Sequence, residues 1–109
     1  MKSVLIKASL MVLVAGLMLP SFALAADTGP ELFAAKCAMC HGKDGSGNTA
    51  MGKNLKLKDL GSADVQKASD ADLKTILEKG KGKMPAYGGK LSSTQIDDLV
   101  KFVRSLKKK

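Results

Sequence analysis

The residues best suited to chemistry are gathered in one pentapeptide, CAMCH, which spans Cys37 to His41. It contains both cysteines and the single histidine of the 109-residue chain. Two thiols and an imidazole at this spacing allow four kinds of chemistry: a disulfide, a metal site, a redox-active dithiol or the attachment of a cofactor. The rest of the sequence has to distinguish among them.

Three of these alternatives find little support elsewhere in the chain. A structural zinc site needs four ligands, usually from a second Cys or His pair, and the sequence has no such pair. A thioredoxin-like dithiol is expected at the start of a helix that follows a strand, whereas CAMCH is predicted to end a helix with no strand before it. A disulfide between Cys37 and Cys40 would close a very short loop of little entropic value and would give His41 no role.

The remaining alternative is covalent attachment of haem, because C-x-x-C-H is the attachment signature of c-type haem. On a helix, Cys37 and Cys40 project from one face about a turn apart. This arrangement suits two thioether bonds to the two vinyl groups of a porphyrin. The next residue, His41, then lies under the iron as its proximal ligand. The motif therefore predicts one covalently bound haem c with its iron.

A haem iron that only carries electrons needs a second axial ligand, and methionine is the usual partner of histidine. Met39 lies inside the motif on the proximal side, and Met51 is interpreted as a haem-pocket or surface-loop residue. Met84 lies in the loop KMPAYGG, where Pro85 favours an extended conformation at Met84. Met84 is therefore predicted as the distal ligand of the iron. With both axial positions filled, no site remains for oxygen or peroxide, which indicates an electron carrier rather than an enzyme.

The sequence predicts four helical stretches, joined by glycine-rich connections, that would position these residues. The first begins at Thr28, which with Glu31 has the pattern of a capping box, and it carries CAMCH. The glycine-rich run GKDGSGN ends it. In residues 49–61 leucines alternate with lysines, but no second strand candidate exists to pair with them, so we expect an extended loop or a short helical turn. A short second helix is expected in SADVQKA.

The third and fourth helices have the clearest ends. Ser69 caps the third helix, with Asp72 at the capping-box position, and Gly80 ends it. The last helix starts at Ser92, where Gln95 completes a capping box. One face of the last helix is apolar over a wide arc and comprises Ile96, Leu99, Val100, Phe102, Val103 and Leu106.

Residues 1–25 have the layout of a secretory signal peptide that is cleaved. Lys2 and Lys7 form a basic start, an uncharged apolar run follows, and the small residues at 23–25 suit a signal peptidase. The alternative is an uncleaved membrane anchor, because the uncharged run is marginally long enough to span a bilayer. Cleavage would leave residues 26–109 as a single exported domain with no attachment to the membrane.

The chain resembles the class I c-type cytochromes, the small soluble bacterial ones in particular, over essentially all of residues 29–107. GPELFAAKCAMCH resembles the N-terminal helix of the family, KMPAYGGKLS its methionine loop and IDDLVKFVRSLK its C-terminal helix. The resemblance implies an all-α cytochrome c fold with about four short helices around one covalently bound haem. It also implies that the N- and C-terminal helices cross, that Gly29 lets them approach closely, and that Phe33, Leu99 and Phe102 make the contact.

A chain this short has a small core and usually needs a staple such as a metal or cofactor. Haem would give several aliphatic side chains a flat apolar surface, so the apoprotein is predicted to be largely unfolded. These aliphatic residues are Leu55, Leu57, Leu60, Leu73, Ile76 and Leu77.

The chain has no Trp and one Tyr, so the hydrogen bonds that some relatives make to the haem propionates need other donors. The candidates are Tyr87, Asn54, Lys53 and backbone N–H groups.

The formal net charge is +8, and lysines form two groups, one around Met84 and one before it in the chain. One interpretation is solvation of the surface. The other is a positive rim around an exposed haem edge that steers an acidic redox partner. Nucleic acid is not expected as a partner, because the predicted export and the 4% aromatic content do not suit it. The lysines are Lys79, Lys81, Lys83 and Lys90 in one group and Lys53, Lys56 and Lys58 in the other.

These features predict a monomeric periplasmic one-electron carrier that shuttles electrons between redox complexes. Two alternatives remain open. A dedicated electron-accepting subunit of one periplasmic dehydrogenase or oxidase would use the same haem ligands. A small haem peroxidase would need a vacant or labile site at Met84.

Overall fold

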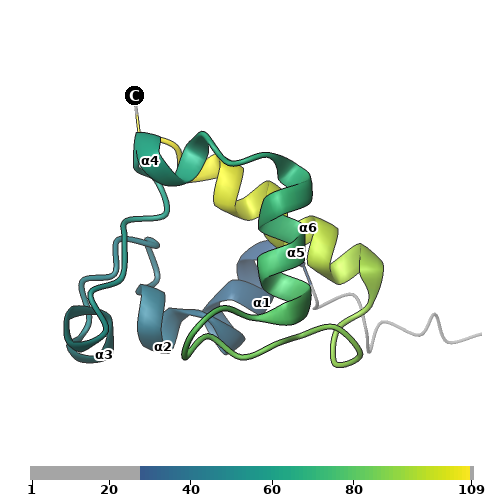
Figure 1. The fold of residues 1–109 in the computed structure, drawn as a ribbon, viewed down its shortest axis with the longest axis horizontal. Helices are drawn as coiled ribbons and strands as arrows, with labels where there is room; N and C mark the ends of the chain where they lie inside the picture. Colours follow the sequence, from purple (N-terminus) through teal and green to yellow (C-terminus); the bar gives the residue numbers. More distant parts are fainter. Residues whose placement is uncertain (1–27, 109) are drawn as a thin grey trace, which may run out of the picture.

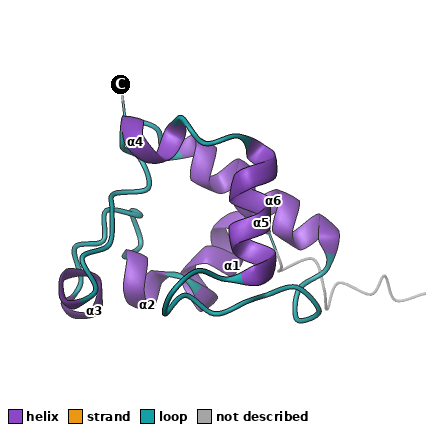
Figure 2. Cartoon of the chain, viewed as in Figure 1, coloured by secondary structure: helices purple, strands orange, loops and turns teal. Residues whose placement is uncertain are grey.

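The chain folds into an all-α arrangement, as predicted (Figures 1 and 2). The computed structural model describes residues 28–108, and the predicted signal peptide lies outside them. Within this range there are two isolated β-bridges and no strand. No helix of the described range has the length and apolar character that a membrane crossing requires. In chain order the helices are α1 (Gly29–Lys36), α2 (Ala38–His41), α3 (Ala50–Asn54), α4 (Ala63–Gln66), α5 (Asp70–Lys79) and α6 (Ser93–Ser105).

The first helix differs from the expectation in two ways. It is divided at Cys37 into α1 and α2, which together with α3 gives six helical segments in the described residues instead of about four. The predicted capping box of Thr28 and Glu31 does not form, because the side chain of Thr28 accepts no hydrogen bond at the start of α1. Pro30 lies in the first turn and has no N–H, which removes one of the donors that an N-cap side chain can use.

The two longest helices, α5 and α6, begin where the sequence predicts, and α5 also ends as predicted, at Gly80. At the start of α5, the Ser69 hydroxyl accepts the Asp72 N–H at 3.0 Å, and Gly80 ends the helix with a φ of 76°. At the start of α6, the Ser92 hydroxyl accepts the Gln95 N–H at 3.1 Å, and the Gln95 side chain accepts the Ser92 N–H at 2.8 Å. These bonds satisfy N–H groups that a helix start leaves unpaired, so residues close in sequence fix both helix starts.

Helices α1 and α6 cross in close contact (Figure 1). A methyl group on Gly29 would come within 2.5 Å of the Asp98 carbonyl oxygen. The rings of Phe33 and Phe102 lie 4.7 Å apart between centroids, and Leu99 is only 1% exposed. The helix crossing and the contact residues that the family resemblance implied are therefore confirmed.

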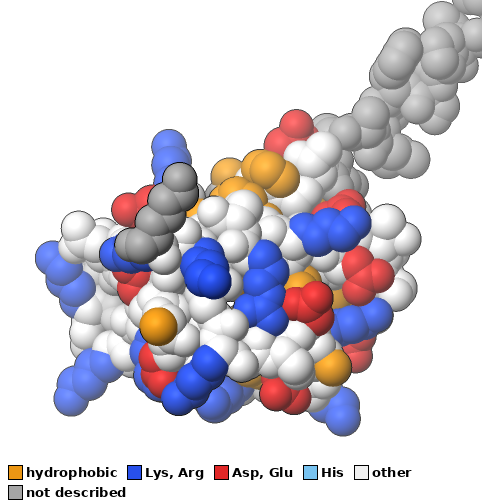
Figure 3. Space-filling view, turned by 90° about the horizontal axis from the view of Figure 1, so that it is seen from above, with side chains coloured by type: hydrophobic (Ala, Val, Ile, Leu, Met, Phe, Trp, Pro, Cys, Tyr) orange, Lys and Arg blue, Asp and Glu red, His pale blue; other side chains and the backbone are white. Residues whose placement is uncertain are grey.

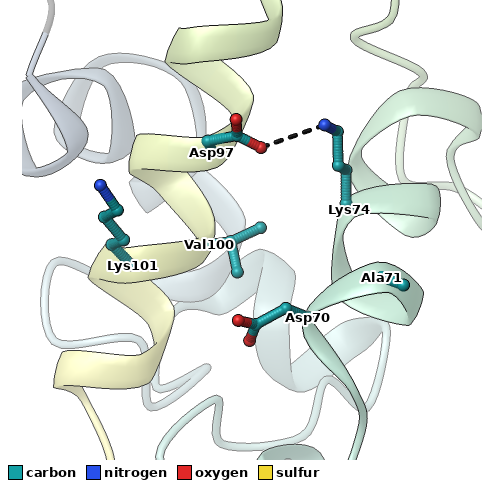
Figure 4. Close-up of a pocket in the computed structure, with 6 residues that line it drawn as sticks. All are labelled: Asp70, Ala71, Lys74, Asp97, Val100 and Lys101. Carbon is teal, nitrogen blue, oxygen red and sulfur yellow. Dashed lines mark ion pairs between the residues drawn. The ribbon is translucent and has the colours of Figure 1, made fainter.

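Helix α5 packs on α6 beside this crossing. A surface groove of about 280 Å³ runs between the two helices, with Val100 in its lining and an ion pair between Lys74 and Asp97 at 3.1 Å across it (Figure 4). No residue of CAMCH lines the groove, so it lies outside the candidate site. The buried core comprises Leu32, Phe33, Cys37, Leu77, Ile96, Leu99 and Val100.

Candidate functional site

The break between α1 and α2 positions the two cysteines. The Cys37 carbonyl oxygen accepts the N–H of Cys40 at 3.2 Å and that of His41 at 2.9 Å. Cys37 is buried, Cys40 is half-buried, and both are free thiols. Burial, and then the neighbouring Cys40, raise the pKa of Cys37 to about 11. The Cys37 thiol is therefore protonated at neutral pH, which does not fit a redox-active dithiol with a lowered thiol pKa.

A glycine-rich loop holds α2 through backbone contacts. The Thr49 hydroxyl donates to the Cys40 carbonyl oxygen at 2.7 Å, and the Gly47 N–H donates to the His41 carbonyl oxygen at 2.6 Å. Gly52 packs so closely that a methyl group on it would lie 2.6 Å from the Cys40 carbonyl oxygen. These contacts satisfy carbonyl groups that the end of a helix leaves without partners, and they fix the position of the pentapeptide.

The His41 imidazole lies beside the core with one ring nitrogen unpaired. Its centroid is 6.3 Å from that of the Phe33 ring. Its Nδ1 atom is buried and has no hydrogen-bond partner among the described residues. Burial lowers the pKa of His41 below its ordinary value, because it penalises the charged form. The imidazole is therefore neutral at pH 7, which is the form that binds metal ions.

The loop after α5 brings Met84 to the same apolar cluster as Cys37. Met84 and Lys81 form an isolated β-bridge through N–H···O contacts of 3.0 and 3.2 Å, which closes a tight turn. Three residues later, the Tyr87 N–H donates to the Leu77 carbonyl oxygen at 2.9 Å and returns the loop to the end of α5. Met84 is half-buried and packs against the core cluster that contains Cys37.

The surroundings of the pentapeptide fit a haem. Between residues 38 and 61 every buried residue is a glycine, so no larger side chain of this segment belongs to the core. Half-buried aliphatic side chains, two free thiols and a neutral imidazole are groups of the kinds that can supply an apolar surface, covalent anchors and an axial ligand to haem c. The half-buried aliphatic residues are Leu55, Leu57, Leu60, Leu73 and Ile76, whereas Leu77 is buried.

The other two methionines of the described chain lie outside this cluster. Met39 is 82% exposed and Met51 is 44% exposed. Two residues that position the pentapeptide, Thr49 and Gly52, are not among those predicted from the sequence. Their signal is a capping threonine directly after the glycine-rich run GKDGSGN.

The candidate donors to the haem propionates differ in their surroundings. Lys53 and Asn54 are exposed on α3. The Tyr87 hydroxyl instead donates to the Lys36 carbonyl oxygen at 3.3 Å. Burial raises the pKa of Tyr87, so its hydroxyl keeps its proton and remains a donor. Of the three side chains, Tyr87 is thus the one already engaged by another part of the chain.

A comparison with known families shows which family the chain belongs to. A family model described as cytochrome c oxidase, cbb3-type, subunit III matches residues 24–103, which is more than half of the chain. The chain belongs to this family of c-type cytochromes. As a small class I cytochrome, it carries covalently bound haem c with its iron.

Individual relatives agree with this assignment. The cytochrome is 37% identical over 89 residues to cytochrome c6 of Gloeothece citriformis, which covers 77% of this chain and 74% of the relative. It is 39% identical over 82 residues to the cbb3-type cytochrome c oxidase subunit FixP of Azorhizobium caulinodans. That match covers 75% of this chain but only 27% of FixP. Among solved structures, the KustC0563 c-type cytochrome matches with a TM-score of 0.69 and 31% identity, over 74% of this chain and 99% of the other.

Proposed function

We propose that this cytochrome is a periplasmic one-electron carrier that moves electrons between redox complexes and catalyses no reaction of its own. In this proposal Cys37 and Cys40 form the thioether bonds to haem, His41 is the proximal ligand of the iron and Met84 is the distal ligand. The observation that carries the proposal is the convergence of Met84 and the pentapeptide on one apolar cluster. Bound haem supplies an iron that alternates between the ferric and ferrous states.

The residues of the chain suit this role in different ways. The neutral imidazole of His41 can bind iron without first losing a proton. The thioether of Met84 is a soft ligand, and pairing it with histidine raises the reduction potential. With both side chains on the iron, oxygen and peroxide find no open position, which argues against a peroxidase. The half-buried leucines would cover the apolar faces of a bound haem and exclude water from them.

The similarity to cytochrome c6 supports a separate shuttle, because it extends over most of the length of those proteins. A second candidate is an electron-accepting subunit of an oxidase, which the match to the cbb3-type subunit III family favours. Purification from the native membrane and periplasmic fractions distinguishes the two. A shuttle is recovered alone in the periplasmic fraction, whereas a subunit is recovered in fixed ratio with a larger complex.

The lysines around Met84 favour an acidic redox partner. Lys79, Lys81, Lys83 and Lys90 are exposed, and none forms an ion pair within residues 28–108. On the face shown in Figure 3, basic and acidic side chains are interspersed. Unpaired lysines give a positive potential that speeds the approach of an acidic protein. The rate of electron transfer with such a partner should fall steeply as salt rises, and a flat rate would remove the steering idea.

A redox titration of the haem-loaded protein tests the proposed function. We expect a single reversible one-electron transition and no rapid binding of carbon monoxide or cyanide to the native protein. Rapid binding of either ligand together with peroxide turnover would contradict the proposal and support the peroxidase alternative.

A further inference from the structure

Tyr87 connects the methionine loop to the end of α1. Its hydroxyl donates to the carbonyl oxygen of Lys36, 51 positions away in the sequence, at 3.3 Å. Lys36 is the last residue of α1 and directly precedes Cys37. Tyr87 is the third residue after Met84, in the sequence MPAY. The hydrogen bond therefore joins the two segments that hold opposite sides of the proposed haem site.

The Lys36 carbonyl group has an open position for this bond because α1 ends there. In an unbroken helix the N–H of Cys40 would bond to this oxygen. Here the Cys40 N–H bonds to the Cys37 carbonyl oxygen at 3.2 Å instead. The last carbonyl groups of a helix need partners from elsewhere, and a side-chain hydroxyl can supply one. The break that positions the two thiols thus also creates the acceptor for Tyr87.

The other anchors of the methionine loop (residues 80–92) lie on α5 and belong to the backbone. The Tyr87 N–H bonds to the Leu77 carbonyl oxygen at 2.9 Å, and the Gly88 N–H bonds to the Glu78 carbonyl oxygen at 3.0 Å. In the described part of the chain, no other hydrogen bond links this loop to α1 or α2. The hydroxyl of Tyr87 is therefore the polar contact that holds the loop against the segment carrying the pentapeptide.

We propose that the Tyr87 hydroxyl is a latch that keeps Met84 on the haem iron by tying the methionine loop to the end of α1. Tyr87 is in this role a positioning residue, and the inference rests on the proposed ligation by Met84. Movement of the loop away from the haem breaks the hydrogen bond to Lys36. Loss of the hydroxyl should therefore raise the population of the open loop by about 2- to 10-fold, the effect of one partly exposed hydrogen bond.

The binding of imidazole to the ferric haem-loaded protein measures this opening. Imidazole can reach the iron only after Met84 has left it, so its apparent affinity reports the open population. The variant Tyr87→Phe keeps the ring and removes only the hydroxyl. We expect it to bind imidazole about 2- to 10-fold more tightly than the parent. An affinity equal to that of the parent would overturn the latch.

Two control variants separate a latch from a general loss of stability. Ser105→Ala removes a hydroxyl that bonds to the Phe102 carbonyl oxygen within α6, and it should leave imidazole affinity unchanged. Val103→Ala truncates a buried side chain on α6 and should lower the free energy of unfolding without raising imidazole affinity, because a loop can open without global unfolding. If Val103→Ala raised the affinity as much as Tyr87→Phe, the latch would be wrong.

The ferric spectrum of the parent tells failure of the latch from failure of the site. An iron–sulfur charge-transfer band in the parent supports ligation by methionine. If this band is present and Tyr87→Phe behaves like the parent, only the latch is contradicted. If the band is absent, ligation by Met84 is contradicted and the latch falls with it.

Discussion

Two halves of the molecule are held together in different ways. The helical half, made of α1, α5 and α6, contains the buried core, in which Phe33 and Ile96 are each 2% exposed. The loop half, residues 38–61 with α2 and α3, has only glycines among its buried residues. Its contacts include backbone hydrogen bonds, the bond from the Thr49 hydroxyl to the Cys40 carbonyl oxygen, and close approaches such as that of Gly52 to Cys40. The helical half is thus a core made by the chain, whereas the loop half needs an apolar partner that the chain does not provide.

The difference indicates where haem contributes to stability. Backbone hydrogen bonds add modestly to stability because the unfolded chain makes similar bonds to water. Apolar burial is the dominant favourable contribution to folding. Leu60 of the loop half already packs against the core cluster, but Leu55 and Leu57 do not and would gain this contribution when haem covers them. The loop half should therefore depend on haem far more than the helical half does.

The largest expected effect is the loss of haem itself. The double variant Cys37→Ala, Cys40→Ala cannot form the thioether bonds, and we expect the resulting apoprotein to be largely unfolded. The measurement is circular dichroism with heating, together with the dispersion of its amide NMR signals. A cooperative transition and a well-dispersed spectrum would show that the loop half folds without haem, and the comparison of the two halves would be wrong.

Two glycine substitutions probe the halves separately. A methyl group at Gly52 would lie 2.2 Å from the Gly47 carbonyl oxygen, and one at Gly29 would lie 2.5 Å from that of Asp98. Overpacking of this kind costs about 1–3 kcal/mol. We expect Gly52→Ala to shift the haem absorption spectrum and the reduction potential. Gly29→Ala should instead lower the free energy of unfolding and leave the spectrum of the folded protein unchanged.

Matched controls exist for both glycines. Asn48→Ala changes an exposed residue in the loop before α3, and Thr28→Ala removes a side chain that makes no capping bond at α1. Both should behave like the parent in denaturant melts and in the redox titration. If Gly29→Ala altered the potential as much as Gly52→Ala, the two halves would not be separable.

The next effect concerns residues 62–69, the segment with α4 that links the loop half to α5. Arg104 on α6 donates to the Gln66 carbonyl oxygen at 2.8 Å, to the Ala68 carbonyl oxygen, and to the Asp70 carboxylate at 2.8 Å. Arg104→Ala leaves these partly buried carbonyl groups without a partner and should lower the free energy of unfolding by about 1–3 kcal/mol. Lys101→Ala, an exposed position on the same helix, is the control for denaturant unfolding. Equal stability of the two variants would contradict a structural role for Arg104.

The smallest effect is electrostatic and lies at the surface. The neighbouring Lys58 and Lys67 lower the pKa of the exposed Asp64 carboxyl from 3.8 to about 2. A carboxyl whose pKa is lowered by folding adds stability above its unfolded pKa and loses that contribution as the pH falls through the folded value. An NMR titration of Asp64 should therefore give a midpoint near 2, and the midpoint should rise in the variant Lys58→Ala. A midpoint near 3.8 in the parent would contradict the ion pairs.

The sequence predicts best what depends on neighbouring residues. The starts of α5 and α6 follow from capping side chains three positions apart, Ser69 with Asp72 and Ser92 with Gln95. The capping box at Thr28 fails although its pattern is similar, which shows that the pattern alone does not ensure the bond.

Contacts between distant segments are harder to predict. The pentapeptide and Met84 can be proposed as a site from residue types, but the hydrogen bond from Tyr87 to Lys36 joins residues that no local pattern relates. The break at Cys37 is also missed, because the helical pattern of the sequence continues through it. By contrast, the approach of Gly29 to α6 is a contact between distant segments that the family resemblance implies.

The absorption spectrum of the haem-loaded protein and its variant Met84→Ala tests the central claim most directly. We expect the parent to be low-spin in both oxidation states, with an iron–sulfur charge-transfer band in the ferric form. In Met84→Ala the band should disappear, and the iron should become open to carbon monoxide in the ferrous form. A variant that kept the band and a low-spin ferrous spectrum would contradict the proposal that His41 and Met84 share one haem iron.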